Sequence, residues 1–288
     1  MHQEKKHEIL WIFNNFLGTK VMQFLFSAGD VRSVRWIMLS LWRKFINIQR
    51  LSRTMKIGII SAMDSEHRQL AERLQQKCER VDGAFRYVEG ELNGNQVILT
   101  QCGIGKVNAA VGAAELIRRY APHCIISTGV AGGIDCSLRV ADVVASSKLV
   151  YHDVYCGNDG TAYGQIQGMP LYYEAHPALL SHALSIQEAD VRICGGLICT
   201  GDRFVEDKAE LATIKQHFPD GMAVDMESAA LAQVCHIYGV PFISFRIVSD
   251  TPGTHDDNFS QYQDFWTTMA ERSFHATWAF LSTLPQEI

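Results

Sequence analysis

The amino-acid sequence predicts an α/β fold, a three-layer sandwich in which helices cover both faces of a mostly parallel or mixed central sheet. Three observations indicate this class. From residue 55 onward, short apolar runs without helical periodicity alternate with longer segments of helical pattern. Asn93-Gly94, a strong hairpin signal, separates two strand-like runs. The composition, 47% hydrophobic and 20% charged over 288 residues, allows a core to be buried.

The first half of the predicted domain contains four strands and two helices. Asp64 or Ser65 is a suitable N-cap for the first helix, because short polar side chains accept hydrogen bonds from free backbone N–H groups. The fourth strand runs into the Gly-rich segment 129–133. The predicted strands cover residues 56–62, 85–92, 95–101 and 124–128, and the predicted helices cover residues 64–76 and 103–120.

The second half continues the alternation of strands and helices, which favours a largely parallel sheet. The segment 156–170 is Gly-rich and polar, typical of a loop near a site or an interface. Strands are predicted at residues 142–151, 195–200, 222–224 and 241–249, and helices at residues 176–187, 208–218, 227–238 and 259–284.

Residues 1–54 differ from the rest of the chain. They hold nine Lys or Arg against three acidic residues, a net +6, so the remainder of this −5 chain carries −11. Three hypotheses fit: a basic amphipathic stretch on a membrane surface, an extra docking helix, or an upstream extension with natural translation starting at Met55. We favour the extension, because Met55 directly precedes the first strand of a complete domain, 55–288. Membrane contact is the less favoured alternative.

Composition narrows the function classes. The net charge of −5 argues against a nucleic-acid-binding role. The eight cysteines include no CxxC pair, which disfavours a zinc site, and a reduced cytoplasmic protein without metal or cofactor is the simplest interpretation. No run reaches the roughly 18 apolar residues of a membrane-spanning helix.

Charged and aromatic residues follow the carboxyl ends of the predicted strands, where ligands bind in such sheets. Glu66 follows the first strand, Phe204 a later one, and Asp225 and Glu227 the next. Asp250 follows the last strand. We therefore expect carboxylates, a Gly-rich turn and an aromatic ring to meet in one cleft.

Six ordered blocks in this sequence resemble the methylthioadenosine/S-adenosylhomocysteine nucleosidases of the nucleoside phosphorylase superfamily. The blocks are KIGIISAMDSE, CGIGKVNAA, STGVAGG, TGDRF, AVDMESAALAQVC and RIVSD, and the resemblance covers Met55 to the C-terminus. It implies hydrolysis of the N-glycosidic bond of a small nucleoside, through an oxocarbenium-like transition state, by a cofactor-free homodimer.

The resemblance assigns a task to each of three carboxylates. Asp250 matches the general acid that protonates adenine at N7, Glu66 the water-activating glutamate, and Glu227 the residue that binds the 2′- and 3′-hydroxyls of ribose. Each has a plainer interpretation: Asp250 as a helix N-cap, and Glu66 as a first-turn acid complementing the helix dipole. Arg246 matches an arginine near Glu227 and the water, or forms an ion pair with Glu227 or Asp225.

The remaining substrate-binding positions rest on the resemblance alone. Phe204 matches the ring that stacks on adenine, and the backbone of Val205 contacts the base edge. Met226 lines the apolar face of the ribose. The other positions in the predicted pocket are Met63, Ile104, Val130, Gly132 and Ser249.

Two departures from the family pattern leave the 5′-substituent open. Val130 stands where some relatives have Ser, and the loop 154–159, which includes Asp159, lacks the hydrophobic residue that covers the 5′-thio group in relatives. Tyr155 or Tyr163 is a candidate replacement. Three alternative functions are therefore kept beside the main hypothesis. They are a hydrolase of another modified nucleoside such as futalosine, a phosphate-dependent purine nucleoside phosphorylase, and a nucleoside-binding sensor.

Overall fold

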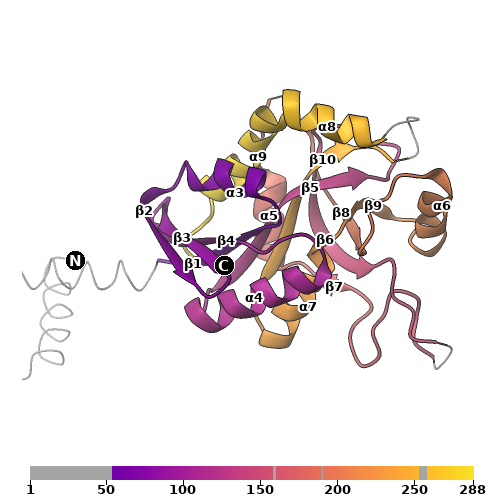
Figure 1. Ribbon diagram of the computed structural model, residues 1–288, viewed down its shortest axis with the longest axis horizontal. Helices are drawn as coiled ribbons and strands as arrows, with labels where there is room; N and C mark the ends of the chain where they lie inside the picture. The colour runs from indigo at the N-terminus through magenta and orange to yellow at the C-terminus, as the bar shows by residue number, and fades with distance from the viewer. Residues whose placement is uncertain (1–53, 158–159, 190, 253–257) are drawn as a thin grey trace, which may run out of the picture. The chain divides into compact units, whose positions relative to one another are not determined.

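The central sheet of the computed structural model is mixed, and part of it closes on itself (Figure 1). The structure describes residues 54–157, 160–189, 191–252 and 258–288, without the side chains of residues 271–273. Its strands are β1 (Lys56–Ser61), β2 (Gln75–Asp82), β3 (Phe85–Leu92), β4 (Asn95–Gln101), β5 (Cys124–Gly133), β6 (Val143–Tyr151), β7 (Tyr173–Glu174), β8 (Ile193–Thr200), β9 (Gly221–Asp225) and β10 (Phe242–Asp250).

Strand pairing runs in the order β10-β6-β8-β9-β5-β1-β4-β3-β2, with β7 on β6. β10 also pairs with β5, so that β5, β9, β8, β6 and β10 form a closed ring. β1 lies parallel to both β4 and β5, and β5 lies parallel to β10. The carboxyl ends of β1, β5 and β10 therefore lie at the same edge of the sheet.

Helices cover both faces of the sheet, which confirms the predicted α/β sandwich. In Figure 1, α8 and α9 lie above the strands and α4 and α7 below them. The hydrophobic core accordingly has two main parts, one under α3, α5, α8 and α9 and the other under α4 and α7, while α6 packs on a third, smaller cluster. The helices are α3 (Asp64–Ala71), α4 (Lys106–Tyr120), α5 (Pro177–Ser185), α6 (Lys208–His217), α7 (Ser228–Tyr238), α8 (Asn258–Thr268) and α9 (Ala270–Ser282).

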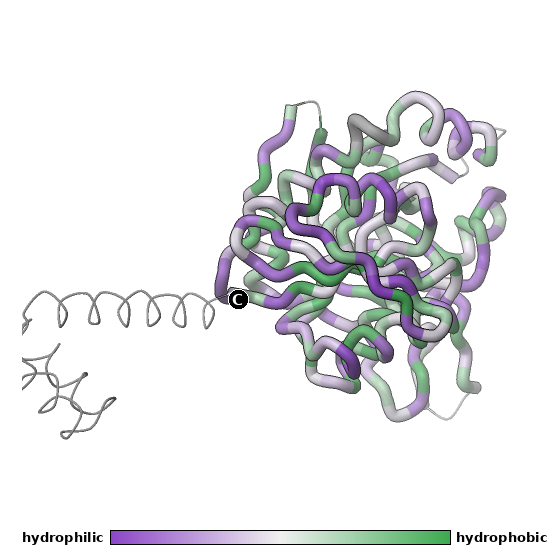
Figure 2. Tube along the Cα trace, turned by 60° about the vertical axis from the view of Figure 1, so that its left-hand side comes forward, coloured by the Kyte–Doolittle hydropathy of each residue, from purple (hydrophilic) through white to green (hydrophobic). Residues whose placement is uncertain are grey.

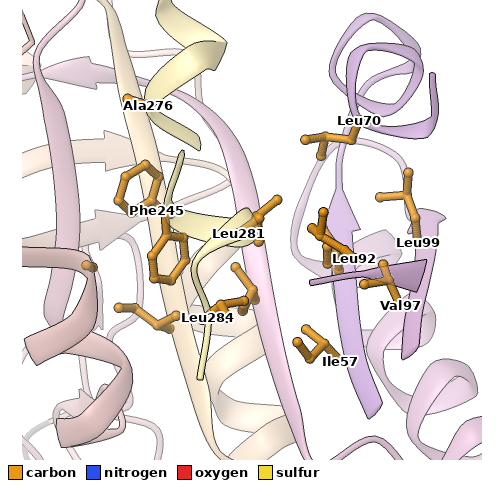
Figure 3. Packing of buried hydrophobic residues seen from close by; sticks show 14 of the residues in the cluster. Ile57, Leu70, Leu92, Val97, Leu99, Phe245, Ala276, Leu281 and Leu284 are labelled. Carbon is orange, nitrogen blue, oxygen red and sulfur yellow. The ribbon is translucent and has the colours of Figure 1, made fainter. Parts of the chain in front are cut away.

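β1 shows why a continuous apolar run forms a central strand. Ile57 and Ile59 face the α3/α9 side of the core, and Ile60 faces the α4 side. Figure 3 shows Ile57 beside Val97 on the former side. Gly58 faces α4, where a Cβ would lie 2.7 Å from Cδ2 of Leu116. Burying each of these isoleucine side chains stabilises the folded protein by about 1.5–3 kcal/mol.

The hydropathy of the chain follows this layering. In Figure 2, hydrophobic stretches run mostly through the interior and hydrophilic stretches mostly through the outer turns. β2 is an exception among the strands, since all eight of its residues are exposed at the sheet edge. Among the described residues, no helix is both long and apolar enough to cross a membrane.

Most predicted elements are present with small shifts of their ends. The hairpin prediction is confirmed: Asn93 and Gly94 have φ values of +50° and +77°, and Leu92 pairs with Asn95. Positive φ at both loop residues is the geometry that an Asn-Gly pair favours.

Several details of the prediction are wrong. The first helix begins after Met63 as N-cap rather than Asp64 or Ser65, and it ends at Ala71 instead of Gln76. β2 and the two-residue β7 are additional strands. The helix predicted over residues 259–284 is divided into α8 and α9. The hypotheses about residues 1–54 fall almost wholly outside the described residues, so the boundary at Met55 stays a prediction.

Candidate active site

A cavity of about 110 Å³ lies at the carboxyl ends of β1, β5 and β10. All twelve residues that the sequence singles out line it: Met63, Glu66, Ile104, Val130, Gly132, Phe204, Val205, Met226, Glu227, Arg246, Ser249 and Asp250. Asp225, expected in the cleft from its strand end, also lines it, as do five residues that were not predicted there: Ala62, Ala131, Arg203, Val224 and Tyr262.

Glu66 is buried at the start of α3 and is fixed by three backbone groups. Its Oε2 accepts hydrogen bonds from the N–H groups of Ala62 and Met63, both at 3.0 Å. Its Oε1 accepts one from Val130 at 3.1 Å. Glu66 thus caps α3, as the plainer interpretation holds, and at the same time presents an oriented carboxylate to the cavity.

Gly129 allows the guanidinium of Arg246 to approach Glu66. A Cβ at Gly129 would lie 2.5 Å from both Nη1 of Arg246 and Oε1 of Glu66, and the φ of this residue is +153°. No larger residue fits there. The Gly-rich segment 129–133, predicted to follow a strand that ends at Thr128, is in fact the last part of β5, and its Gly129 serves close packing of charged side chains.

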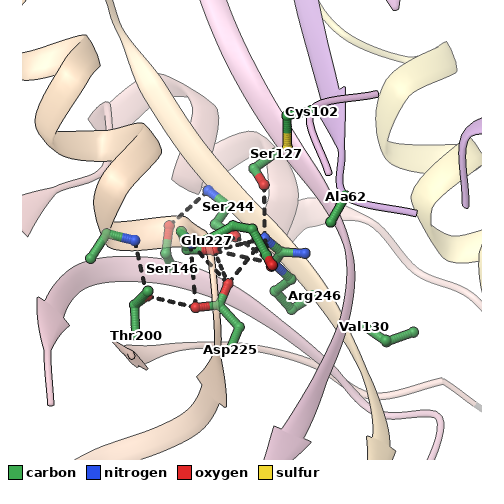
Figure 4. A network of polar contacts seen from close by, with 12 residues as sticks. Ala62, Cys102, Ser127, Val130, Ser146, Thr200, Asp225, Glu227, Ser244 and Arg246 are labelled. Atoms are coloured by element: carbon green, nitrogen blue, oxygen red, sulfur yellow. Dashed lines mark hydrogen bonds and ion pairs between the residues drawn. The ribbon is translucent and has the colours of Figure 1, made fainter. Parts of the chain in front are cut away.

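Arg246 is the centre of a buried polar network (Figure 4). Its Nη2 lies 3.0 Å from Oδ2 of Asp225 and 3.6 Å from Oε2 of Glu227, so both ion pairs considered from the sequence are present. Nε donates to the hydroxyls of Ser228 and Ser244 at 3.1 and 3.2 Å. Nη2 also donates to the hydroxyls of Ser127 and Ser228.

Asp225 anchors this network from the end of β9. Its Oδ1 accepts a hydrogen bond from the hydroxyl of Thr200 at 2.6 Å, and Oδ2 accepts one from the hydroxyl of Ser228. The backbone N–H of Ser228 also donates to the carboxylate. Asp225 therefore positions Arg246, a task that its place at a strand end signals only in part.

Glu227 lies beside this network with one side toward the β4–α4 turn. Its Oε1 accepts a hydrogen bond from the backbone N–H of Gly105 at 2.9 Å. Burial raises the pKa of Glu227 to about 7, although Arg246 and the Gly105 N–H oppose that rise. Burial also raises the pKa of Glu66 above its ordinary value, again against the effect of Arg246.

Asp250 lies at the end of β10 and is 2% exposed. The hydroxyl of Ser249 donates to its Oδ1 at 2.7 Å. Burial raises the pKa of Asp250 to about 6, although the Ser249 hydrogen bond favours the ionised form. A carboxyl group with such a pKa is able to hold a proton near neutral pH and donate it.

Aromatic and apolar side chains form the mouth of the cavity. The ring of Phe204 packs edge-on against Tyr262, with the centroids 5.5 Å apart, and the hydroxyl of Tyr262 donates to Sδ of Met63 at 3.3 Å. Phe204 is 39% exposed, which leaves ring surface for a flat ligand. Tyr262 belongs to α8 and does not follow a strand in the sequence. No feature of the sequence predicts that it lines the cavity.

The two tyrosines considered as substitutes for the 5′-covering residue do not line this cavity. Tyr163 stacks on His217, with the centroids 3.7 Å apart, and its hydroxyl donates to the carbonyl of His152. Tyr155 packs against Tyr163 at 6.3 Å. Asp159 lies outside the described residues.

No cluster of three or more His, Cys, Asp or Glu suited to a metal ion occurs within the described parts of the chain. All eight cysteines are free thiols. The cavity lining offers carboxylates, the buried guanidinium of Arg246 and backbone N–H groups.

Comparison with known proteins shows the superfamily to which the chain belongs. Residues 56–282 match the family model of the phosphorylase superfamily, so the chain is a member of that superfamily. The chain is 43% identical over 204 residues to the 5′-methylthioadenosine/S-adenosylhomocysteine nucleosidase of Chromohalobacter salexigens. The aligned region covers 70% of this chain and 87% of the relative.

Solved structures agree with this relationship. A crystal structure of the same kind of nucleosidase from Colwellia psychrerythraea, in complex with adenine, superposes with a TM-score of 0.76 at 34% identity, covering 82% of this chain and 98% of that one. Futalosine hydrolase of Helicobacter pylori superposes with a TM-score of 0.74 at 26% identity, covering 80% and 99%. Within the superfamily, the chain belongs to the 5′-methylthioadenosine/S-adenosylhomocysteine nucleosidase family, which confirms the resemblance seen in the sequence.

Proposed function

We propose that this chain hydrolyses the N-glycosidic bond of 5′-methylthioadenosine and S-adenosylhomocysteine, releasing adenine and the thioribose product. The observation that carries the proposal is the presence of a protonatable Asp250 in the same buried cavity as Glu66, which three backbone N–H groups hold in place. The names of the relatives support the same substrates.

Asp250 is the proposed general acid. Adenine leaves readily only as a neutral base, because its anion is a poor leaving group. Donation of the Asp250 proton to N7 supplies that neutral base as the bond from C1′ to the adenine nitrogen breaks. The raised pKa keeps the proton available near pH 6, and the Ser249 hydroxyl orients the carboxyl group.

Glu66 is the proposed base for the attacking water. Its carboxylate retains acceptor capacity beyond the three backbone hydrogen bonds, because two oxygens offer about four lone-pair sites. A water held there loses a proton to Glu66 as its oxygen bonds to C1′. Arg246 beside Glu66 opposes the rise in the pKa of the carboxyl group, and so favours the ionised form that accepts the proton.

Glu227 is the proposed ribose ligand. Two adjacent hydroxyls suit one carboxylate, and the Gly105 hydrogen bond fixes the orientation of Glu227. Met226 lines the cavity beside it. The positive charge that develops on the ribose ring in an oxocarbenium-like transition state is stabilised by these buried carboxylates.

A phosphorylase reaction is disfavoured by the charges of the cavity. Phosphate requires cationic groups that are not already neutralised. Of the described lining residues, the two arginines are both paired: Arg203 with Glu210 at 2.6 Å, and Arg246 with Asp225 and Glu227. Water therefore suits the position beside Glu66 better than a phosphate anion.

The 5′-substituent is recognised, in this proposal, by the apolar side chains of Met63, Ile104 and Tyr262 at the mouth of the cavity. A panel of methylthioadenosine, S-adenosylhomocysteine, 5′-deoxyadenosine and futalosine, with release of the base as the readout, tests this point. We expect the two thio-substituted nucleosides to have the highest kcat/KM. A preference for futalosine would overturn the substrate assignment in favour of the rival hydrolase.

We also propose a homodimer. Ile104 lines the cavity, yet it is 52% exposed. Val107 and Val111 follow it at helical spacing along α4 and are also exposed. A second copy packed on this face would cover these side chains and the cavity wall together. Sedimentation equilibrium of the full chain tests this, and a monomer at micromolar concentration would contradict it.

The domain boundary and the cellular setting are further parts of the proposal. The free cysteines support a reducing, cytoplasmic compartment, where removal of methylthioadenosine would feed methionine salvage. We place the start of the enzyme domain at Met55. Residues 55–288 and the full chain should then release adenine at equal rates, and a loss of activity in the shorter chain would contradict that boundary.

A further inference from the structure

Lys106, Asp153 and Asp202 form a closed cluster outside the cavity, which we call the anchor cluster. Nζ of Lys106 lies 2.8 Å from Oδ1 and 2.7 Å from Oδ2 of Asp153. The backbone N–H of Lys106 donates to Oδ1 of Asp202 at 2.8 Å. The backbone N–H of Asp202 donates to Oδ2 of Asp153 at 2.9 Å. Each residue thus contacts both of the others.

The anchor cluster joins three segments that are distant in the sequence, and two of them, those of Ile104 and Phe204, contribute residues to the cavity lining. Lys106 begins α4, directly after Gly105, whose N–H bonds to Glu227. Asp202 follows β8 and precedes Phe204 by two residues, and Asp153 follows β6. The cluster therefore fixes the backbone that carries the Gly105 N–H.

The position of Gly105 leaves little freedom for this backbone. Its φ is +95°, a conformation that favours glycine, and a Cβ there would lie 3.1 Å from Oδ1 of Asp202. The side chains of Lys106 and Asp153 are only 23% and 21% exposed, so that water screens their ion pair less than a fully exposed one. Asp153 is the member that contacts both the side chain of Lys106 and the backbone of Asp202.

We propose that Asp153 is a positioning residue for ribose recognition: by fixing Lys106 and Asp202, it holds the Gly105 N–H on Glu227 and so orients the Glu227 carboxylate toward the ribose hydroxyls. This inference rests on the ribose-binding role proposed for Glu227. Asp153 itself lies outside the cavity lining and acts through Gly105.

The test compares Asp153→Asn with a matched control, Asp220→Asn. Asp220 also pairs with a lysine at 2.7 Å, Lys148, and this lysine lies over the ring of Tyr172 much as Lys106 lies over that of Tyr151. The Lys148–Asp220 pair has no member in the cavity lining. It therefore reports the effect of losing a similar ion pair elsewhere on the protein.

Each variant of the full chain is assayed with 5′-methylthioadenosine and with its 2′-deoxy analogue. Asp153→Asn should lower kcat/KM for the ribonucleoside by about tenfold, mainly through KM, the size expected for misplacing one hydrogen bond to a charged group. For the 2′-deoxy analogue, which lacks a hydroxyl for Glu227 to bind, Asp153→Asn should lower kcat/KM by less than about threefold. Asp220→Asn should leave kcat/KM unchanged for both substrates.

Equal losses for both substrates, or the same result for Asp153→Asn and Asp220→Asn, would overturn the inference. If Asp153→Asn does not fold, Lys106→Met provides the same comparison, with the same selective loss expected. Glu227→Gln serves as the reference for lost discrimination between the two substrates. A wild-type chain that releases no adenine would sink the proposed function, whereas an active wild type with a non-selective Asp153→Asn sinks this inference alone.

Discussion

Nη2 of Arg246 lies 3.0 Å from Oδ2 of Asp225, and both side chains are buried in the wall of the cavity. The pair sits beside two further buried carboxylates, Glu66 and Glu227. The guanidinium of Arg246 therefore balances the charge of three acidic groups. Because all of these groups are buried, leaving any one of them unpaired would destabilise the protein. This arrangement makes Asp225 a determinant of where Arg246 points.

Asp225→Asn should destabilise the protein by about 3 kcal/mol, the lower range for breaking a buried ion pair, because Glu66 and Glu227 remain near Arg246. Urea unfolding measures the free energy. Asp220→Asn removes one partner of an exposed pair and should cost less than about 1 kcal/mol. Equal losses in the two variants would contradict the anchoring role of Asp225.

Gly129→Ala should reduce activity far more than a glycine substitution in open space. The new Cβ would lie 2.5 Å from both Glu66 and Arg246, and must displace at least one of them. We expect a fall in kcat of about 100-fold or more, the effect of misplacing a base and its partner. Gly239→Ala, with φ of +67° and no atom of the described residues within 4 Å of the new Cβ, strains the backbone alone and should leave kcat unchanged.

Asp250→Asn should abolish turnover and yet stabilise the protein at alkaline pH. The pKa of Asp250 is raised to about 6 in the folded protein, so the stability of the wild type declines as pH rises through that value and the carboxylate must ionise in a buried site. Removing the charge should raise Tm at pH 8 by about 5 °C, and by less than half as much at pH 4.

Asp220→Asn is the control of opposite sign for that measurement. The Lys148 hydrogen bond lowers the pKa of Asp220, so its ionised form stabilises the fold at pH 8 and loses this contribution in acid. The variant should therefore lower Tm slightly at pH 8. A decrease in Tm at pH 8 for both variants would contradict the account of Asp250.

Glu66→Gln should lower kcat by at least about 100-fold while adenine still binds within about threefold of the wild-type affinity. The substitution removes the base for water but leaves Phe204 and Asp250, which contact adenine in this mechanism. Initial rates and calorimetric titration with adenine measure the two quantities. Full activity in this variant would sink the assignment of the base.

The alternation of apolar runs and helical patterns was sufficient to predict the layers, because strands such as β1 are apolar on both faces. β2 was not predictable in this way: all its residues are exposed, and pairing with β3 alone makes it a strand. The break between α8 and α9 reflects a local competition between side-chain and backbone hydrogen bonds. Thr267 and Thr268 both donate to the carbonyl of Asp264, and such bonds bend helices.

The ends of strands predicted a cleft with carboxylates and an aromatic ring, the family resemblance supplied the other positions, and all twelve of the residues line one cavity. Asp225 was expected at this cleft from its strand end and as a partner of Arg246, but its role in holding Arg246 was not predicted, because nothing in a single sequence shows which carboxylate lies deeper. Tyr262 reaches the cavity from α8, and its contact with Met63 spans 199 residues of sequence. Local patterns do not encode contacts of that range, and the closure of the sheet through β10 is hidden for the same reason.

Release of adenine from 5′-methylthioadenosine by the full chain in phosphate-free buffer tests the central claim most directly. The reaction should proceed to free adenine and 5-methylthioribose at a rate that added phosphate leaves unchanged, since water at Glu66 is the proposed nucleophile. A rate that requires phosphate, with the sugar recovered as its 1-phosphate, would contradict the account.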